Sequence, residues 1–496
     1  MKNKIYNKVV FLLTALIVFA SCSDLLDAPD IKVNPNAPAD APIDVLLSGA
    51  LVGLSVVHED TDTRLSYMWS GQLSGLSRQH AGFGIYNVAA STFDNSWSIL
   101  YSATGNARII QEKAAPLNNK VALGIGQVME ALLIAKVTVL YGDVPYSQAF
   151  DVVKFPKPVF DKQADVYAAL IKLLDNAYAN LSSPLGSVSS SQEFIFGGDA
   201  SKWASVAKTL QARLYLHLGD NANAIASALN GIQDTAGDAL IPHGSAQTID
   251  NNLNFDFFEN SRPGDTGLDG AFLPAFMKTR LDGVAQVPAE AKRNSATDET
   301  ALLNHFFQFG IYGAATSLDP NTIDGMFTAD APHPLLTYYE NQLILAEAYA
   351  RQGGASILLA VAALNSVRQE LASGYINGKV IDAAYQGLGI QYDDYSDTDF
   401  TPGGLANPVS TGRDLQKGLL YEIISQKYIL SLAQYNVFTD VRRLAKATPL
   451  VQLPIPPTFG TQIPSRFIYP QNEINTNGAN VPSPLPDQYV KLPIFQ

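Results

Sequence analysis

The chain has 496 residues, of which 47% are hydrophobic and only 16% are charged, and its formal net charge is −13. This length and apolar content suffice for a large core in one or two domains, and the negative charge argues against nucleic acid as a partner. The single cysteine, Cys22, excludes disulfide bonds within the chain and metal sites that need several cysteines.

The N-terminus has the pattern of a signal peptide. Three lysines precede an apolar run over residues 9–20. The run ends in Phe19-Ala20, and Ser21 and Cys22 follow, so that small residues stand before the cysteine. Twelve residues at about 1.5 Å each cannot cross a hydrocarbon layer of roughly 30 Å, so residues 1–21 are predicted to be a signal peptide and not an anchor helix.

The position of Cys22 resembles the lipobox of bacterial lipoproteins, in which the cysteine is acylated and becomes the mature N-terminus. Several acyl chains would hold the protein on a membrane. The alternative is ordinary cleavage near Ala20-Ser21, with Cys22 incidental. Four prolines within residues 22–44 predict an extended, lipidated tether.

An apolar helix is predicted over residues 45–57, followed by the acidic cluster His58-Glu59-Asp60-Thr61-Asp62. This cluster could coordinate calcium, but it lacks the glycine and terminal glutamate of a calcium loop, so a solvated helix end is favoured. Residues 67–86 are rich in Gly and Ser and are predicted to form loops, which leaves the aromatic residues Trp69 and Tyr86 free for other roles.

The strongest structural prediction is a helical hairpin within residues 119–181. Apolar residues recur at helical spacing over 125–140 and again over 166–181. The first helix should end at Gly142 and Pro145, and Asp161 is a suitable N-cap for the second. Two such helices cannot cover their own apolar faces, so further helical pairs should stack on them.

Similar periodicity predicts further helices on both sides of an irregular stretch. The predicted helices span residues 93–116, 203–218, 221–232, 335–351, 355–371, 415–432 and 437–444. Residues 234–333 are rich in Phe, Gly and Asn without periodicity, and we expect an ordered functional insertion in which packing accounts for most of the rings. A second irregular insertion covers residues 373–412, and the tail from Pro449 onward is rich in proline.

The order of short motifs along the chain resembles the SusD/RagB lipoproteins, specifically the branch with the second type of SusD-like domain. No single motif is decisive, and their order and spacing carry the resemblance. The matching pieces are Phe93-Asp94-Asn95-Ser96-Trp97, Tyr141-Gly142-Asp143-Val144-Pro145-Tyr146, Phe196-Gly197-Gly198-Asp199 with Lys202-Trp203, residues 208–217, Thr337-Tyr338-Tyr339-Glu340, Leu345-Ala346-Glu347-Ala348, Gln426-Lys427-Tyr428-Ile429, Asp440-Val441-Arg442-Arg443, Pro464-Ser465-Arg466-Phe467 and Tyr469-Pro470.

The resemblance implies a mainly α, SusD-like fold in which tetratricopeptide-type helical pairs form one side and long irregular loops face the ligand. It implies a single SusD-like domain over residues 45–496, located on the outer membrane as a lid over a SusC-like TonB-dependent transporter. Such a protein captures glycans or other nutrients for import. One departure is Thr279-Arg280-Leu281-Asp282, where this branch commonly has Asp-Pro-Arg.

Flat aromatic rings are the natural candidates for ligand contact, because the apolar face of a sugar packs on them while polar side chains bind its hydroxyls. The leading candidates are Trp69, Tyr86 and Tyr312, and Tyr392 and Tyr395 in the acidic loop come second. Packing in the core is the alternative for each ring.

Three classes of function were compared. An enzyme should present catalytic motifs, and the chain has no HExxH spacing, GxSxG elbow or Walker loop, although two carboxylates could still meet in space as in a glycosidase. A helical-repeat scaffold that binds only proteins is a second alternative. The aromatic insertion favours the third class, non-catalytic capture of a nutrient, most simply a glycan, without cofactor, metal or nucleic acid.

Overall fold

The structure is a computed structural model that describes residues 41–183, 185–283, 290–309, 318–445 and 450–495. Cys22 and Tyr312, with the predicted signal peptide and most of the tether, lie outside these residues. Within them the protein is mainly α-helical, as predicted.

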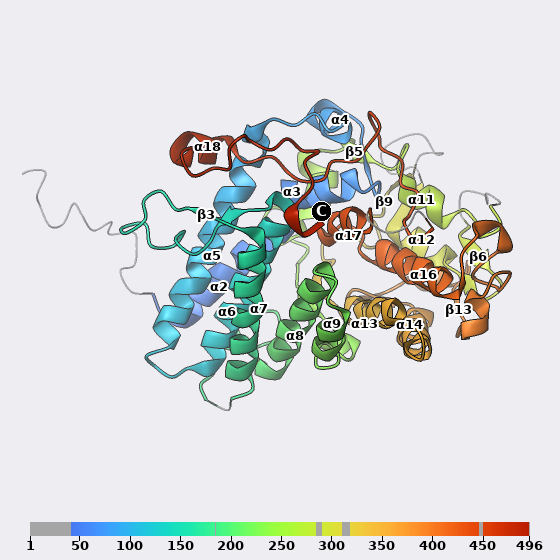
Figure 1. Ribbon diagram of the computed structural model, residues 1–496, viewed down its shortest axis with the longest axis horizontal. Coiled ribbons are helices and arrows are strands. Elements are labelled where there is room, and N and C mark those ends of the chain that lie inside the picture. The colour runs from blue at the N-terminus through green and yellow to red at the C-terminus, as the bar shows by residue number, and fades with distance from the viewer. Residues whose placement is uncertain (1–40, 184, 284–289, 310–317, 446–449, 496) are drawn as a thin grey trace, which may run out of the picture.

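Long helices of the first half pack side by side in a row (Figure 1). In chain order the helices are α2 (Ile43–His58), α3 (Thr61–Trp69), α4 (Arg78–Gly84), α5 (Asp94–Ala114), α6 (Lys120–Tyr141), α7 (Gln163–Leu181), α8 (Ala200–His217) and α9 (Asn221–Ala228). Helix α6 packs against both α5 and α7, α7 packs against α8, and α8 packs against α9. Each helix therefore covers a face that its neighbour leaves exposed.

The row continues into the second half of the chain. Its helices are α13 (Tyr338–Gln352), α14 (Ser356–Ala372), α16 (Leu415–Leu430), α17 (Asn436–Leu444) and α18 (Gln471–Asn477). Helix α13 contacts α9, α14 and α16, so residues separated by more than 100 positions extend one helical layer. The predicted pairs over 335–371 and 415–444 are confirmed, and no end differs from the prediction by more than three residues.

Short elements fill the two irregular stretches and the connections. The short helices are η2 (Ala90–Phe93), η3 (Thr235–Gly237), α10 (Leu253–Asp256), η4 (Phe257–Ser261), α11 (Phe272–Met277), α12 (Thr300–Phe306), α15 (Ala383–Gln386), η5 (Asp397–Phe400), η6 (Val409–Thr411) and η7 (Pro493–Phe495). The strands are β1 (Ser74–Gly75), β2 (Val144–Pro145), β3 (Phe160–Asp161), β4 (Ala239–Ile241), β5 (Thr266–Gly267), β6 (Lys292–Asn294), β7 (Thr297–Asp298), β8 (Phe307–Phe309), β9 (Leu318–Pro320), β10 (His333–Leu336), β11 (Tyr375–Ile376), β12 (Lys379–Val380) and β13 (Gln391–Tyr392).

These strands pair only in small antiparallel sheets. The pairs are β1 with β5, β2 with β3, β4 with β10, β8 with β9 and β11 with β12, and the order β13-β7-β6 makes the one sheet of three strands among the described residues. Because β4 lies near the start of the insertion and β10 begins at its last residue, their pairing closes most of residues 234–333 into a loop that returns to the helical layer.

Helix α6 lies at the centre of the core. Its residues are almost all buried, including Lys136, whose ammonium donates to Asp60 Oδ1 and Thr63 Oγ1, each at 2.9 Å. The helix is long and apolar enough to span a membrane, but 94% of its most apolar window is covered by the protein itself. It ends at Gly142, as predicted, where φ is +92° and a Cβ would lie 3.0 Å from Leu492.

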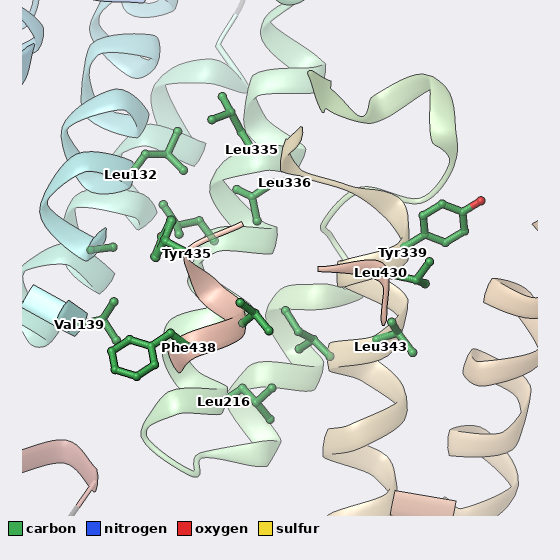
Figure 2. Packing of buried hydrophobic residues seen from close by; sticks show 14 of the residues in the cluster. Leu132, Val139, Leu216, Leu335, Leu336, Tyr339, Leu343, Leu430, Tyr435 and Phe438 are labelled. Atoms are coloured by element: carbon green, nitrogen blue, oxygen red, sulfur yellow. The ribbon is translucent and has the colours of Figure 1, made fainter. Parts of the chain in front are cut away.

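One hydrophobic core connects early and late parts of the chain. Figure 2 shows side chains of α6, α8, β10, α13 and α17 facing one another, among them Leu132, Leu216, Leu336, Leu343 and Phe438. The C-terminal tail enters the same core, since the ring of Phe467 lies 5.1 Å from that of Trp69 and 5.0 Å from that of Phe93. The tail is therefore an integral layer of the fold.

The predicted N-cap of α7 is wrong. The helix begins at Gln163 after Lys162, and Lys162 makes no side-chain cap. The carboxylate of Asp161 instead accepts hydrogen bonds from the backbone N–H groups of Tyr146 and Ser147 at 2.8 and 2.7 Å, which fixes the turn after α6.

Candidate functional site

The best-defined cavity that combines a buried cation with an exposed ring lies between α17 and the C-terminal tail. Helix α17 forms its floor, and residues 452–465 cross above it. Pro454, Pro456 and Pro457 keep the crossing segment extended, because proline fixes φ near −65° and lacks a backbone donor. We call this cavity the tail groove.

The tail groove has two connected parts. The larger part has a volume of about 270 Å³, and its lining includes Arg442, Gln452, Thr461, Gln462, Ser465, Lys491 and Phe495. The smaller part holds about 30 Å³ and is mostly apolar, with Lys427, Tyr428 and Asp440 at its edge. Val441, Gln452, Ile455 and Ile463 line both parts.

The last turn of α17 contains two arginines, whose positive charge complements the helix dipole. The two side chains have different surroundings. Arg443 is held by Glu347, at 2.8 and 2.9 Å, and by Asp440 at 2.7 Å. Arg442 lies beside the groove and donates to the carbonyl oxygens of Phe438 at 3.0 Å and Ser465 at 3.2 Å. The bond to Ser465 links the floor of the groove to its roof.

The loop 456–460 borders the groove through Pro457 and carries an exposed aromatic ring two residues further on. Phe459 is 60% exposed, the most among aromatic side chains that the structure describes, and it lies between the groove residues Pro457 and Thr461. Thr458, the residue before this ring, anchors the loop. Its backbone N–H donates to the phenol oxygen of Tyr86 at 2.8 Å, and the Thr458 hydroxyl donates to the carbonyl oxygen of Gly84. A flat ring on an anchored loop is suited to packing on a sugar face.

A second aromatic group lies beside the smaller part. The rings of Phe272 and Phe276 on α11 stack at 5.3 Å, and both lie about 6 Å from Tyr428, which lines this part. Both phenylalanines are only partly buried. The predicted functional insertion thus contributes rings next to the groove, although its Phe257, Phe258, Phe306 and Phe307 are core residues.

Charge in the groove is unevenly balanced. Burial, together with nearby Arg466, lowers the pKa of Arg442 to about 9. At the smaller end, Lys427 pairs with Asp440 at 3.0 Å, and the charges of Lys427 and Arg443 hold the pKa of Asp440 low even though burial acts to raise it. Lys427 and Arg443 thus have carboxylate partners, whereas no carboxylate of the described residues lies within 4.0 Å of Arg442 in the larger part.

A further cavity of about 570 Å³ lies beside Phe495, and its lining includes Arg351, Lys417 and Arg443. Its cations already have carboxylate partners, since Arg351 and Arg443 bind Glu347 and Lys417 binds Asp414. This cavity offers less for a ligand to bind than the tail groove.

The structure places Trp69 and Tyr86 in the core, which argues against direct ligand contact by either ring. Trp69 is 1% exposed, and its indole lies between the rings of Tyr86, Phe438 and Phe467 at 5.1 to 5.8 Å. Tyr86 is also buried, although its hydroxyl positions the loop that carries Phe459. The Gly-rich sequence around these two rings predicts that they are exposed. The C-terminal tail, which is distant in sequence, covers them instead.

Tyr392 and Tyr395 are buried as well. The guanidinium of Arg368 lies over both rings, at 5.6 and 3.8 Å, and the hydroxyl of Tyr395 is 2.7 Å from that of Thr297. These tyrosines stabilise the second irregular stretch from inside and present no open face. Tyr312 lies outside the described residues.

The acidic cluster after α2 is not a solvated helix end. Glu59 and Asp62 are buried, with Glu59 accepting from His243 at 2.9 Å and Asp62 accepting from the hydroxyl of Tyr141 at 2.7 Å. Burial and neighbouring Asp60 raise the pKa of Asp62 to about 7. Across the described ranges, no three His, Asp or Glu side chains are grouped so that they could hold a metal ion.

Sequence reasoning missed Arg442 and Phe459. Arg442 belongs to the Asp-Val-Arg-Arg motif, which enters the sequence analysis only as part of the family resemblance, and Phe459 lies in the proline-rich tail, for which the sequence predicts no site. The available signal was Pro456-Pro457-Thr458-Phe459-Gly460, in which a large apolar ring stands in a turn where no core could cover it.

Comparison with known proteins identifies the class. A family model for SusD-like proteins, described as starch-binding and associating with the outer membrane, matches residues 35–470. The helical layer with a tail-covered face is thus the architecture of a SusD-like protein, and the chain belongs to this family. No curated protein matches it.

Solved structures share the fold at low sequence identity. A SusD/RagB family protein from Bacteroides thetaiotaomicron is 20% identical, with a TM-score of 0.63 over 88% of this chain and 95% of that one. A SusD homologue from Parabacteroides distasonis is 17% identical, with a TM-score of 0.67 over 92% and 98%. A protein described as chitin-binding is 20% identical, with a TM-score of 0.57 over 88% and 95%.

Proposed function

We propose that this protein is a lipoprotein of the outer membrane, anchored through Cys22, that captures a nutrient and delivers it to a SusC-like TonB-dependent transporter. A glycan is the favoured nutrient. The observation that carries the proposal is the match of residues 35–470 to a family described as starch-binding and associating with the outer membrane. The fold shared with a chitin-binding protein adds support for a saccharide.

The chemistry of the tail groove agrees with a sugar ligand. Phe459 beside it offers an apolar ring, and Gln452, Thr461, Gln462 and Ser465 offer amide and hydroxyl groups to sugar hydroxyls. Because Phe459 is 60% exposed, its ring is accessible to a ligand without unfolding of the tail.

Capture is proposed to occur without chemical change to the ligand. A glycosidase needs two carboxyl groups about 5 to 10 Å apart on either side of the bond that it cleaves. Among the groove residues that the structure describes, Asp440 is the single carboxylate, and it is bound by Lys427 and Arg443. A carboxylate held in two ion pairs is a poor acid or base.

The tether gives the anchored protein freedom to cover a transporter. The 21 residues from Cys22 to Pro42 precede α2, and an extended chain of that length reaches roughly 70 Å at most. A tether of that length would allow the groove to face a partner in the same membrane.

The test is calorimetric titration of the purified lipoprotein with neutral and acidic oligosaccharides, together with product analysis. Phe459→Ala should weaken binding of the recognised glycan about five- to tenfold, since an aromatic contact contributes about 0.5 to 1.5 kcal/mol beyond its buried area. Phe459→Tyr is the matched control and should retain the affinity, because it keeps the ring.

A co-purification experiment tests the partner. The detergent-solubilised lipoprotein, carrying an affinity tag, should retain a TonB-dependent transporter identified by mass spectrometry. Retention of the transporter without binding of any saccharide or peptide would instead support a protein-binding scaffold, and turnover of a bound glycan would establish an enzyme.

A further inference from the structure

Arg442 is a buried cation without a counter-ion. Arg442 is only 6% exposed. Among the described residues no carboxylate lies within 4.0 Å of its guanidinium, whereas its neighbour Arg443 binds both Glu347 and Asp440. Its hydrogen-bond acceptors are the carbonyl oxygens of Phe438 and Ser465 and the hydroxyl of Thr439, and its guanidinium also lies 4.1 and 5.5 Å from the ring centroids of Phe438 and Phe495. These neutral groups solvate the cation, but no described carboxylate neutralises it beside the groove.

The surroundings of Arg442 increase this imbalance. Arg466 is also buried, and it donates to the carbonyl oxygens of Tyr141 and Phe467, again without a carboxylate partner among the described residues. Lys491, which has an interaction of its own, also lines the larger part. Removing a charge from water is unfavourable unless an opposite charge compensates, so an anion entering this cavity would recover part of that cost.

The lining indicates which anion fits. A planar guanidinium matches a carboxylate with two parallel hydrogen bonds, and Arg442 has N–H groups beyond the three used by the protein. The amide and hydroxyl groups of Gln452, Gln462 and Thr461 surround the same cavity. At about 270 Å³ it is below the usual range for drug-sized ligands, which suits one acidic sugar residue of a longer chain.

We infer that the tail groove binds the carboxylate of a uronic acid residue at Arg442, so that the captured glycan is an acidic polysaccharide. The inference rests on the proposed function and specifies its substrate class. Phe459 beside the groove would then hold a neighbouring sugar ring of the same chain.

The test compares acidic glycans with their neutral forms. The full-length lipoprotein in detergent is titrated calorimetrically with uronic tetrasaccharides from pectin, alginate and hyaluronan, with their methyl esters, and with neutral tetrasaccharides of starch and chitin. At least one acid should bind about tenfold or more tightly than its methyl ester, as expected for a hydrogen-bonded charged pair. Arg442→Gln should abolish that preference, and Arg442→Lys should retain part of it.

Lys417→Gln is the matched control, because it removes one positive charge at the neighbouring cavity and should leave the preference unchanged. Thermal melting shows whether Arg442→Gln is folded; if it is not, the comparison of acid with ester in the wild-type protein decides alone. Equal affinity for acids and esters, or preference for neutral glycans, would overturn the inference and leave glycan capture intact. Absence of binding to every saccharide would count against the proposed function as well.

Discussion

Tyr86 connects the N-terminal half to the tail across 372 positions of sequence, because its phenol oxygen accepts the backbone N–H of Thr458. Tyr86→Phe removes that acceptor and keeps the buried ring. We expect a loss of about 1 kcal/mol in the free energy of unfolding, measured by urea denaturation, since one donor loses its partner. Faster amide exchange at Thr458 should accompany this loss.

Tyr489→Phe is the control for this change. Tyr489 lies near Tyr86 in the tail, and its hydroxyl makes no hydrogen bond with a described residue, so its loss should leave stability unchanged. Equal stability of Tyr86→Phe and the wild-type protein would contradict the anchoring role.

His243 donates from both ring nitrogens. Nε2 lies 2.9 Å from the carboxylate of Glu59 and Nδ1 lies 3.2 Å from the carbonyl oxygen of Asp250, so the geometry requires the charged imidazolium. Burial acts to lower the pKa of His243, but the hydrogen bond and charge of Glu59 outweigh it and raise the pKa above 6.5. The stabilisation is complete below 6.5 and is lost as the pH rises through the raised pKa. The stability difference between wild type and His243→Gln should therefore shrink on the alkaline side.

For His333, in the same cluster, we predict the opposite dependence of stability on pH. Burial lowers the pKa of His333 to about 4, against an ordinary value of 6.5. Between these values the unfolded chain binds a proton that the folded protein excludes, so stability should fall by up to about 3 kcal/mol as the pH drops from 6.5 to 4. His333→Gln should flatten that acid limb in denaturation curves; an unchanged limb would refute the assignment.

At the level of helices, the contact between α6 and α7 depends on Gly124. A Cβ at this position would lie 2.5 Å from Cγ of Leu181 and 3.2 Å from the carbonyl oxygen of Ala177. Gly124→Ala should therefore cost about 1 to 3 kcal/mol of stability through overpacking, even though alanine favours helices. The measurement is chemical denaturation.

Gly49 in α2 provides the matched control, because a Cβ there would have no atom within 4 Å. Gly49→Ala should raise stability by up to about 1 kcal/mol through helix propensity alone. If both variants shifted stability in the same direction, close packing of α6 on α7 would not explain the result.

The helices could be predicted from the sequence, but the distant segments that pack on them could not. Apolar spacing in α6, α13 and α16 is a local property that the sequence displays directly. Asp161 has the chemistry of an N-cap, but the turn after α6 uses its carboxylate, a choice visible only in three dimensions. Trp69 looked available in a Gly-rich stretch, because Phe438 and Phe467, which enclose it, lie hundreds of residues away.

For the molecule as a whole, net charge and local charge oppose each other. A net charge of −13 repels acidic polysaccharides at a distance, but physiological salt screens such repulsion beyond about 8 Å. Recognition at Arg442 must therefore rely on direct contact, and steering over long distances should not accelerate it.

Membrane attachment is the remaining prediction at this scale. Cys22→Ser should remove labelling by radioactive palmitate and move the protein from the membrane fraction to the soluble fraction, because acyl chains are its proposed anchor. Ser21→Ala is a suitable control, since it keeps the cysteine and a small residue before it. Membrane retention of Cys22→Ser at wild-type levels would contradict lipid anchoring.

The position of the tail in the core has a consequence for the order of assembly. Helices α5 to α9 are neighbours in sequence, so contacts among them can form between nearby segments of the chain. The tail groove instead needs α17, the crossing segment and Phe495 together, so it is complete only when the last residues of the chain have taken their places. Folding to the end and competence to bind a nutrient therefore coincide, and a partly folded chain would not compete with the finished protein for nutrient.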